Sequence, residues 1–432
     1  MQLNSTTLYQ RLSNEEDARA CAGITDSACR EVPGNFFKIL MAQLSTKLAD
    51  AFTSSKVVLP WLLTSAGAPA FFSALLVPIR ESGSLIPQLI LGGIVRQFQH
   101  RKHFYVIGSV LQGATVALMA ASAIQLDGAR LGWTIIMLLI VFSLGRGLCS
   151  IANKDVVGKT IPKARRGRLG GLSASLSGVI ALLVTGSMLA FQDGSINFVV
   201  AMLVMASFFW MLAAIGFGLI VEYAGATEGG DNGFKVAIKN LNLLRSDIQF
   251  QHFVVTRALL MSSGLAAPFL VLLATPHTDL GGVLLFVILT GIANVVSGLF
   301  WGLLADRSSR FVILLTALMS IVIFVLTALF QATTESTSSS MTVLLVYLLL
   351  YFLLAITHQG VRLGRKTYLV DMADGNQRTD YVSVSNTVIG VLLLVYGAIT
   401  ALVAQWDITA VLVLFAVSSG VAFLMALKLK EI

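Results

Sequence analysis

The sequence predicts an all-α polytopic membrane protein in which twelve transmembrane helices form two similar six-helix bundles. Hydrophobic residues make up 56% of the 432 residues and charged residues only 12%, whereas soluble domains carry roughly 25% charged residues. The apolar residues form long continuous runs, which are typical of membrane-spanning helices and not of the alternating strands of a membrane barrel. The two halves of the chain also resemble each other. Together these features argue against a soluble enzyme and against a disordered chain.

The first segment, residues 1–35, is polar and carries acidic residues at Glu15, Glu16 and Asp17. It lacks the basic start, the short apolar run and the cleavage site of a signal peptide. We therefore expect it to stay in the mature protein as a cytoplasmic tail, with a regulatory lid as the alternative. Pro33 and Gly34 are expected to interrupt the chain before the first span.

Two sets of six apolar helices follow, one in residues 36–222 and one in residues 250–432. A helix needs about 20 apolar residues to cross the hydrocarbon layer, and each run is long enough. The expected spans are 36–64, 70–96, 104–126, 132–158, 168–191, 196–222, 250–275, 280–304, 311–331, 341–370, 381–404 and 408–427. The linker, residues 223–249, begins with the Gly-rich stretch 224–230. Residues 234–241 then predict an amphipathic helix on the membrane surface.

The distribution of basic residues predicts that both termini are cytoplasmic. Of the 30 Lys and Arg residues, only Arg130 falls in an outer loop and five fall within spans, so all the others lie on one face or at the helix ends beside it. Cytoplasmic loops attract basic residues. The net charge of +8 therefore describes anchoring at the inner face of a lipid bilayer and not a nucleic-acid partner. Short loops and a simple tail favour a bacterial inner membrane.

An internal repeat relates the two halves. At an offset of 209 residues, Gly93 aligns with Gly302 and Gln97 with Asp306, each pair at the end of the second helix of its half. Lys154 aligns with Arg365 at an offset of 211. Parallel repeats of this kind are a known transporter construction, with the substrate site near the midplane where the halves face each other.

The loop after the eighth span resembles a motif of the major facilitator superfamily. It has Gly302, Asp306, Arg307 and Arg310 at the spacing of that family's loop motif. The first-half counterpart keeps Gly93 and Arg101 but has Gln97 where Asp is usual. The resemblance implies a secondary active transporter that works by alternating access, and it implies that these residues bias the conformational equilibrium. The alternative is an ordinary turn with inner-face basic anchors.

Two further comparisons with the family concern the fourth and fifth helices. Arg146 resembles the family's arginine on the fourth helix. The glycine-proline pattern of the family's drug antiporters is missing from the fifth, which has glycines without proline. This absence makes a multidrug exporter less expected, but it does not exclude export.

Charged residues within the spans are the main candidates for function, because such a side chain near the bilayer centre costs at least about 2.5 kcal/mol. Five are basic and two are acidic: Lys47, Asp50, Lys56, Arg80, Glu81, Arg146 and Arg257. Two acids can neutralise at most two of the five bases, which leaves three positive charges within the spans. An anionic substrate would neutralise this excess, so the sequence predicts one. Arg80 and Arg146 approach mid-depth, so we expect them to bind its anionic group through paired hydrogen bonds. Lys47 and Arg257 lie nearer the cytoplasmic side, so for them a side chain that reaches the membrane surface or a structural ion pair is as much expected as a role in the site.

Asp50 and Glu81 are the candidate proton carriers, since they are the acids deepest in the spans. A permanent salt bridge is the alternative for each, with Lys47 and Asp50 at three-residue helical spacing as the obvious pair. On the tenth helix, Tyr351, His358, Arg362 and Lys366 lie on one side, which we expect to face the cavity. Arg362, Arg365, Lys366 and Asp371 are alternatively expected to form a gate with Lys154 and Asp155.

The sequence carries no phosphate-binding loop, metal-ligand constellation or nucleophile-base motif, so we predict no enzyme activity, cofactor or metal. The prediction is a monomeric secondary active transporter of a small anionic organic solute, coupled to protons. One alternative is an exporter or flippase of an amphipathic drug or lipid. Another is a membrane receptor or scaffold that does not transport.

Overall fold

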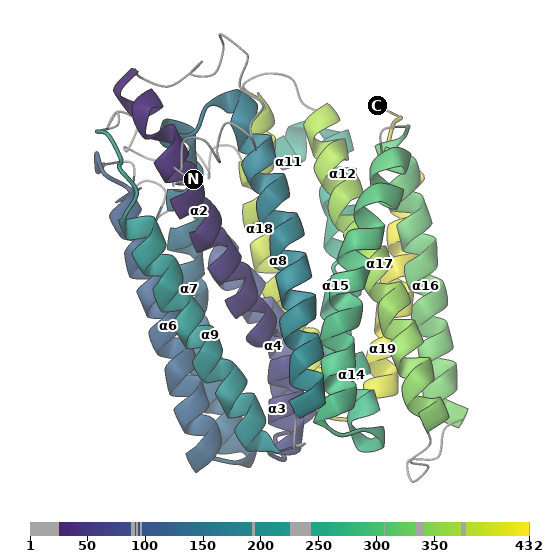
Figure 1. Ribbon diagram of the computed structural model, residues 1–432. Helices are drawn as coiled ribbons and strands as arrows, with labels where there is room; N and C mark the ends of the chain where they lie inside the picture. Colours follow the sequence, from purple (N-terminus) through teal and green to yellow (C-terminus); the bar gives the residue numbers. More distant parts are fainter. Residues whose placement is uncertain are drawn as a thin grey trace.

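The computed structural model describes residues 26–87, 91, 94–95, 97–191, 195–224, 243–305, 307–333, 341–372 and 377–431. Every regular element in these residues is a helix, and the helices run nearly parallel in one bundle (Figure 1). The first half contains α2 (Asp26–Phe52), α3 (Val58–Ser65), α4 (Ala70–Leu85), α6 (Lys102–Gln125), α7 (Gly128–Thr160), α8 (Lys163–Phe191) and α9 (Ile196–Gly218). The second half contains α11 (Leu243–Ser246), α12 (Ile248–Leu259), α13 (Ser262–Leu265), α14 (Ala267–Ala274), the 3-10 turn η1 (Thr275–His277), α15 (Leu280–Ala305), α16 (Ser309–Thr333), α17 (Met341–Asp371), α18 (Gln377–Val403) and α19 (Ile408–Ala426).

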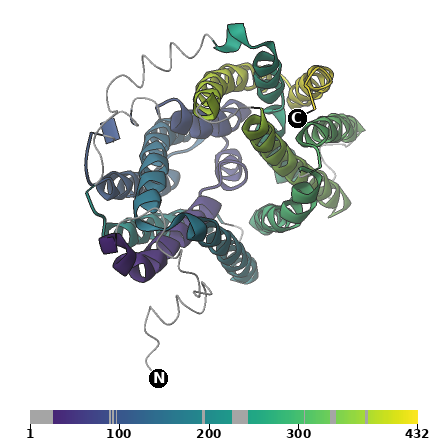
Figure 2. The ribbon, with the colours of Figure 1, turned by 90° about the horizontal axis from the view of Figure 1, so that it is seen from above.

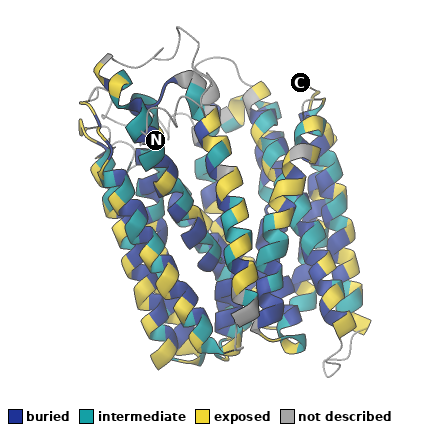
Figure 3. Cartoon of the chain, in the orientation of Figure 1, coloured by how far each residue is buried: buried dark blue, intermediate teal, exposed yellow. Residues whose placement is uncertain are grey.

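Ten spans in the described part are long and apolar enough to cross a membrane, and they match ten of the twelve expected spans. The other two expected spans correspond to α2 with α3 and to α4. The interruption expected at Pro33 and Gly34 is wrong, because α2 continues through both residues. Large apolar side chains such as Phe208, Leu183 and Leu303 are exposed, and exposed residues recur along the outward-facing sides of the helices (Figure 3). Soluble proteins rarely expose apolar surface over a large area, so we infer that a lipid bilayer covers this one.

The first helix of each half is interrupted, although the sequence analysis expected it to be continuous. α2 ends at Phe52 and α3 begins at Val58, while α12, α13 and α14 divide the seventh span. Proline accounts for the break between α2 and α3 and for the one between α13 and α14: Pro60 and Pro268 lack the backbone N–H of a helix and clash with the preceding turn. The end of α12 at Leu259 lies too far before Pro268 to have this cause. The two breaks occupy equivalent places in the repeat. Open backbone at membrane depth is tolerated where it lies inside protein or beside a cavity.

The buried apolar residues show where the halves meet. We call the end of the bundle at which α2 begins and α19 ends the terminal face. One large apolar cluster joins both halves toward the opposite face and includes Trp61, Phe72 and Phe269. Nearer the terminal face, each half has its own cluster, around Phe36 in the first half and Phe253 in the second. The halves are therefore closed together at the opposite face and separate at the terminal face.

Two lateral crossings also hold the halves side by side. Pro78 of α4 packs against Gly397 of α18, and Leu182 of α8 lies against Gly291 of α15. Figure 2, a view along the bundle, shows the first-half and second-half helices as two groups around the centre. Because glycine has no side chain at either crossing, the helices approach closely there.

Candidate functional site

Asp50 lies at the centre of the first-half site and accepts hydrogen bonds from two arginines. The Oδ1 atom of Asp50, on α2, is 2.5 Å from Nη2 of Arg80 on α4 and 2.6 Å from Nη1 of Arg146 on α7. The expected pair of Lys47 and Asp50 is wrong, because the carboxylate reaches across to two neighbouring helices and not along its own. Lys47 is exposed and has no ion pair with a described residue. The three side chains together carry one net positive charge.

Arg80 is held by the break in the first helix as well as by Asp50. Its Nη1 donates to the Ser55 hydroxyl at 3.3 Å, and its guanidinium lies 5.8 Å from the ring centre of Phe142. Ser55 belongs to the turn between α2 and α3. Arg80 is buried, whereas Arg146 is partly exposed. Both arginines were expected to bind the anionic group of a substrate. In this structure the carboxylate that they bind is that of Asp50, so substrate binding by them stays a prediction.

Glu81 and Lys56 extend the charged site toward the second half. Glu81 is exposed, and no described basic side chain lies within ion-pair distance of it. It nevertheless interacts electrostatically with Arg146, Arg80, Lys56 and, from the second half, Arg362. Lys56 lies in the break between α2 and α3 and interacts with Glu81 and Arg362. Charged groups of both halves therefore face the same central space.

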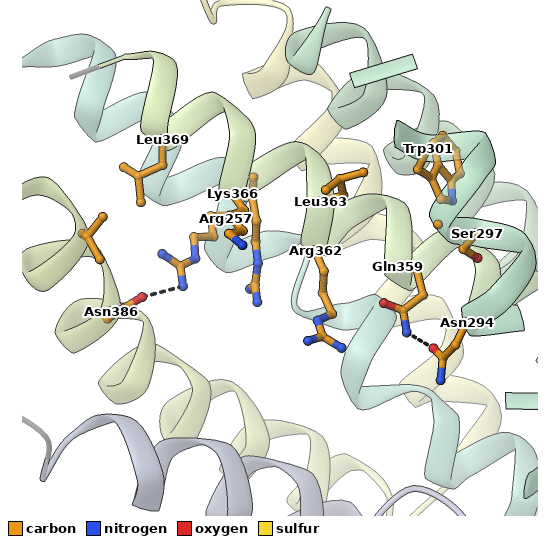
Figure 4. Close-up of a pocket in the computed structure, with 13 residues that line it drawn as sticks. Arg257, Asn294, Ser297, Trp301, Gln359, Arg362, Leu363, Lys366, Leu369 and Asn386 are labelled. Carbon is orange, nitrogen blue, oxygen red and sulfur yellow. Dashed lines mark hydrogen bonds between the residues drawn. The ribbon is translucent and has the colours of Figure 1, made fainter. Parts of the chain in front are cut away.

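The second half has its own cavity, with a volume of about 530 Å³. Basic and amide side chains converge in it from α12, α15, α17 and α18 (Figure 4). Its lining residues are Arg257, Asn294, Ser297, Gly298, Trp301, Gln359, Arg362, Leu363, Arg365, Lys366, Leu369, Val382 and Asn386. Four of these are basic, and none of the described residues that line the cavity is acidic.

Arg257 is the most firmly positioned of the four basic residues. Its Nη1 donates to Ser385 Oγ at 2.6 Å and its Nη2 to Asn386 Oδ1 at 2.9 Å. It is 8% exposed, and no carboxylate among the described residues pairs with it. The sequence left a structural ion pair and a role in the site equally open for Arg257. The ion pair is not formed with any described residue of this structure.

The tenth helix, α17, faces the cavity only along part of the expected stripe. Tyr351 is buried against α15, where its hydroxyl shares a hydrogen bond of 2.8 Å with Thr290, so its predicted place beside the cavity is wrong. Phe286 of α15 packs edge-on against the Tyr351 ring, with 4.8 Å between the ring centres. His358 Nδ1 lies 3.1 Å from Ser263 Oγ in the seventh-span break. Arg362 and Lys366 line the cavity.

The predicted gate is not formed in this structure. Asp155 on α7 pairs within its own half with Arg101 at 2.9 Å. Lys154, Lys366 and Asp371 are exposed, and no ion pair joins the described residues of the fourth and tenth helices. The physical reason is that the halves are separate at the terminal face, where these residues lie. The gate stays a prediction for a state in which that face is closed.

Glu222 is a charged residue that the sequence analysis missed. Its carboxylate accepts hydrogen bonds from the backbone N–H groups of Arg101 and Lys102 at the start of α6, and from Lys159 Nζ at 2.9 Å. A carboxylate at a helix N-terminus stabilises both the open N–H groups and the helix dipole. Its repeat partner at the offset of 209 is Glu431, which binds Arg310 at 3.4 Å.

These contacts describe part of the loop motif. Arg101 and Arg310 also align at the offset of 209. The repeat therefore relates Arg101 to Arg310 and Glu222 to Glu431, and this relation was already visible in the sequence. Gln97 and Arg307 are exposed, and Gly302 lies in the last turn of α15. Gly93 and Asp306 lie outside the described residues, as does the expected amphipathic helix at 234–241.

Asn294, Ser297, Trp301 and Gln359 line the second-half cavity and were also missed. Asn294 and Ser297 are three residues apart on α15, and Gln359 is three residues before Arg362 on α17. That spacing puts each pair on one helix face. The signal was therefore present, although polar uncharged residues in a membrane helix more often serve packing.

Comparisons with known proteins agree on the fold. No family model matches the sequence, and a search of curated proteins found no match. Solved structures do match. A nucleoside transporter, NupG, has a TM-score of 0.66 and 12% identity over 91% of this chain and 99% of its own. A POT family transporter solved with 5-aminolevulinic acid has a TM-score of 0.69 and 11% identity, covering 91% and 94%. A D-xylose-proton symporter has a TM-score of 0.67 and 15% identity, covering 91% and 97%. The chain has the major facilitator fold.

Proposed function

We propose that this chain, with its major facilitator fold, is a secondary active transporter that moves a small anionic organic solute across a bacterial inner membrane by alternating access. It acts as a monomer with both termini in the cytoplasm. Solved structures that share its fold include a nucleoside transporter, a peptide transporter and a D-xylose-proton symporter. Fold alone does not establish activity, so the argument rests on the charged cavity.

One observation carries the proposal: four basic side chains line the second-half cavity without an acidic one among its described residues. Of these four, Arg257 is buried and Arg365 is partly buried, whereas Arg362 and Lys366 are exposed. Leaving a buried charge uncompensated is costly, and a carboxylate or phosphate group compensates arginine through paired hydrogen bonds. A cavity of about 530 Å³ lies within the usual range for small-molecule sites, roughly 300–1,000 Å³. The lining therefore suits a small anion better than a sugar or an organic cation.

The arrangement of the halves supports alternating access. In the present state the halves are separate at the terminal face, which the distribution of basic residues predicts to be cytoplasmic. Rocking about the α4–α18 and α8–α15 crossings would separate the halves at the opposite face and bring Lys154 and Asp155 toward Arg365 and Asp371. The predicted gate would then close behind the solute.

Glu81 is the better candidate for the proton carrier. It is exposed in the central space, whereas a proton arriving at Asp50 has to displace hydrogen bonds from two guanidinium groups. Glu81 also interacts with Arg362 across the halves. Its protonation would weaken that attraction and thereby link proton binding to the cavity. Glu81→Gln is expected to abolish accumulation driven by a proton gradient while preserving exchange.

A counterflow experiment tests the proposal. Proteoliposomes holding the purified chain are loaded with an unlabelled solute and diluted into the labelled one, using organic anions, organic cations and neutral sugars in turn. The proposal expects transient uptake for at least one anion and none for the cations or sugars. A receptor or scaffold would show binding without uptake. Exchange of sugars alone would overturn the anionic cargo.

A further inference from the structure

The second-half cavity contains buried polar atoms that no described group satisfies. Ser297 is 2% exposed, and its hydroxyl has no hydrogen-bond partner. The Nε atom of Arg257 is likewise buried and without a partner. A buried polar atom left unpaired costs about 1–3 kcal/mol. Because both residues line the same cavity, a ligand with several acceptor oxygens would satisfy both.

The charges around these atoms require more than one negative charge. Arg257 interacts electrostatically with Arg365, and Arg365 interacts in turn with Arg362. The first-half acid Glu81 attracts Arg365 and Arg362 from across the central space. A single carboxylate would leave this row of guanidinium groups with a net positive charge. A phosphate monoester carries about −1.5 to −2 at pH 7 and three strong acceptor oxygens.

We propose that this cavity binds the dianionic phosphate or phosphonate group of an organic solute. This inference rests on the proposed transport function and names its substrate class. The unpartnered Nε–H of Arg257 donates to one phosphate oxygen, the Ser297 hydroxyl donates to another, and Arg365 and Arg362 complete the charge. Trp301, Leu363 and Val382 supply an apolar wall for the organic part.

The hydrogen bonds to Ser385 and Asn386 are part of this site. They orient Arg257 from behind and leave its Nε available, so the guanidinium is held in place before the ligand arrives. Preorganised donors of this kind bind anions more tightly than flexible ones. Asn294 and Gln359, which are hydrogen-bonded to each other across the cavity (Figure 4), are placed to contact the organic part.

Calorimetric titration of the full chain in detergent at pH 7.5 tests the proposal with three matched probes. Phenyl phosphate is dianionic and tetrahedral, benzenesulfonate is monoanionic and tetrahedral, and benzoate is monoanionic and planar. We expect phenyl phosphate to bind at least tenfold more tightly than either of the others. Equal affinities for phenyl phosphate and benzenesulfonate would overturn the dianion assignment.

Variants locate the binding. Arg257→Gln is expected to weaken phenyl phosphate binding at least tenfold, since a hydrogen bond to a charged group is lost, and Ser297→Ala about fivefold. Arg130→Gln is the matched control: it removes one exposed arginine, paired with Asp127, at the opposite face. Loss of binding in the control as large as in Arg257→Gln, or no loss in Arg257→Gln, would overturn the site.

The phosphate can belong to a soluble solute or to a lipid headgroup, and competition distinguishes the two. Displacement of phenyl phosphate by glycerol 3-phosphate supports a soluble solute, whereas displacement only by phosphatidate in the micelle overturns it in favour of a lipid. The two proposals also fail differently. Tight phenyl phosphate binding without counterflow contradicts transport alone, and counterflow of anions with equal affinity for all three probes contradicts the phosphate site alone.

Discussion

Asp50 is the residue on which the charge arrangement of the first half depends. It accepts hydrogen bonds from two arginines on different helices, so it joins α2, α4 and α7 at one point. Removing its charge leaves two guanidinium groups close together without a carboxylate. Leaving buried charges without a partner costs more free energy than the original ion pair contributed to stability.

We therefore predict that Asp50→Asn lowers the free energy of unfolding by about 3 kcal/mol. The measurement is thermal unfolding of the purified chain in detergent. Asp127→Asn serves as the control, because its pair with Arg130 is exposed and should contribute little. Equal midpoints for wild type and Asp50→Asn would show that the two arginines do not depend on this carboxylate.

At this scale the sequence predicted which residues carry charge inside the spans but not how they pair. The numbers of acids and bases followed directly from composition and span positions. The partner of Asp50 could not be chosen, because three-residue spacing favours Lys47 only if the carboxylate points along its own helix. The contacts with Arg80 and Arg146 depend on how three helices are rotated against each other, and no local pattern encodes that rotation.

At the scale of elements, the N-terminus of α12 shows how one residue fixes a helix. Asp247 precedes the helix and accepts hydrogen bonds from the backbone N–H groups of Gln249 and Phe250 and from the Tyr381 hydroxyl of α18. Burial alone would raise the pKa of the Asp247 carboxyl, but these hydrogen bonds lower it below its usual value. The Tyr381 hydroxyl donates to Oδ2 of Asp247 at 2.6 Å.

This arrangement predicts a pH dependence of stability. The pKa of Asp247 is lower in the folded than in the unfolded chain, so its charge stabilises the fold above the unfolded value, about 3.9. That contribution is lost as the pH falls through the folded pKa. The difference in unfolding midpoint between wild type and Asp247→Asn should therefore be largest near pH 6 and shrink below about pH 4. A difference that stays constant from pH 6 to pH 3 would contradict the lowered pKa.

The helix breaks were less predictable than the helices themselves. Hydropathy identified each span, because an apolar run of sufficient length is a strong signal. Pro60 lies in the first span and Pro268 in the seventh, but the separation of α2 from α3 and of α12, α13 and α14 was not expected. Proline produces a kink or a full break according to what surrounds it. The hydrogen bonds of Ser55 with Arg80 and of Ser263 with His358 are part of that surrounding structure.

At the scale of the whole molecule, the internal repeat and the positions of the basic residues carried most of the prediction. They gave two bundles, a linker between them and a site where the halves face each other. The state of the molecule could not be predicted, since the same sequence serves every state of a transport cycle. The separation of the halves at the terminal face follows from how the apolar clusters are divided in this structure.

The second-half cavity also belongs to this scale, because four helices from distant parts of the chain build it. The sequence analysis placed the anion on Arg80 and Arg146, and it treated Arg257 as equally a structural residue. The structure pairs the first two with Asp50, whereas Arg257 faces a cavity with no acidic residue in its described lining. The charge excess remains the reason to propose an anionic solute, with its centre moved to the second half.

The measurement that tests this account most directly is the initial rate of phenyl phosphate counterflow in proteoliposomes of wild type, Arg257→Gln and Arg130→Gln, each reconstituted at the same protein content. The account predicts uptake by wild type, the same rate for Arg130→Gln and at least a tenfold lower rate for Arg257→Gln. A rate for Arg257→Gln equal to that of wild type would contradict it.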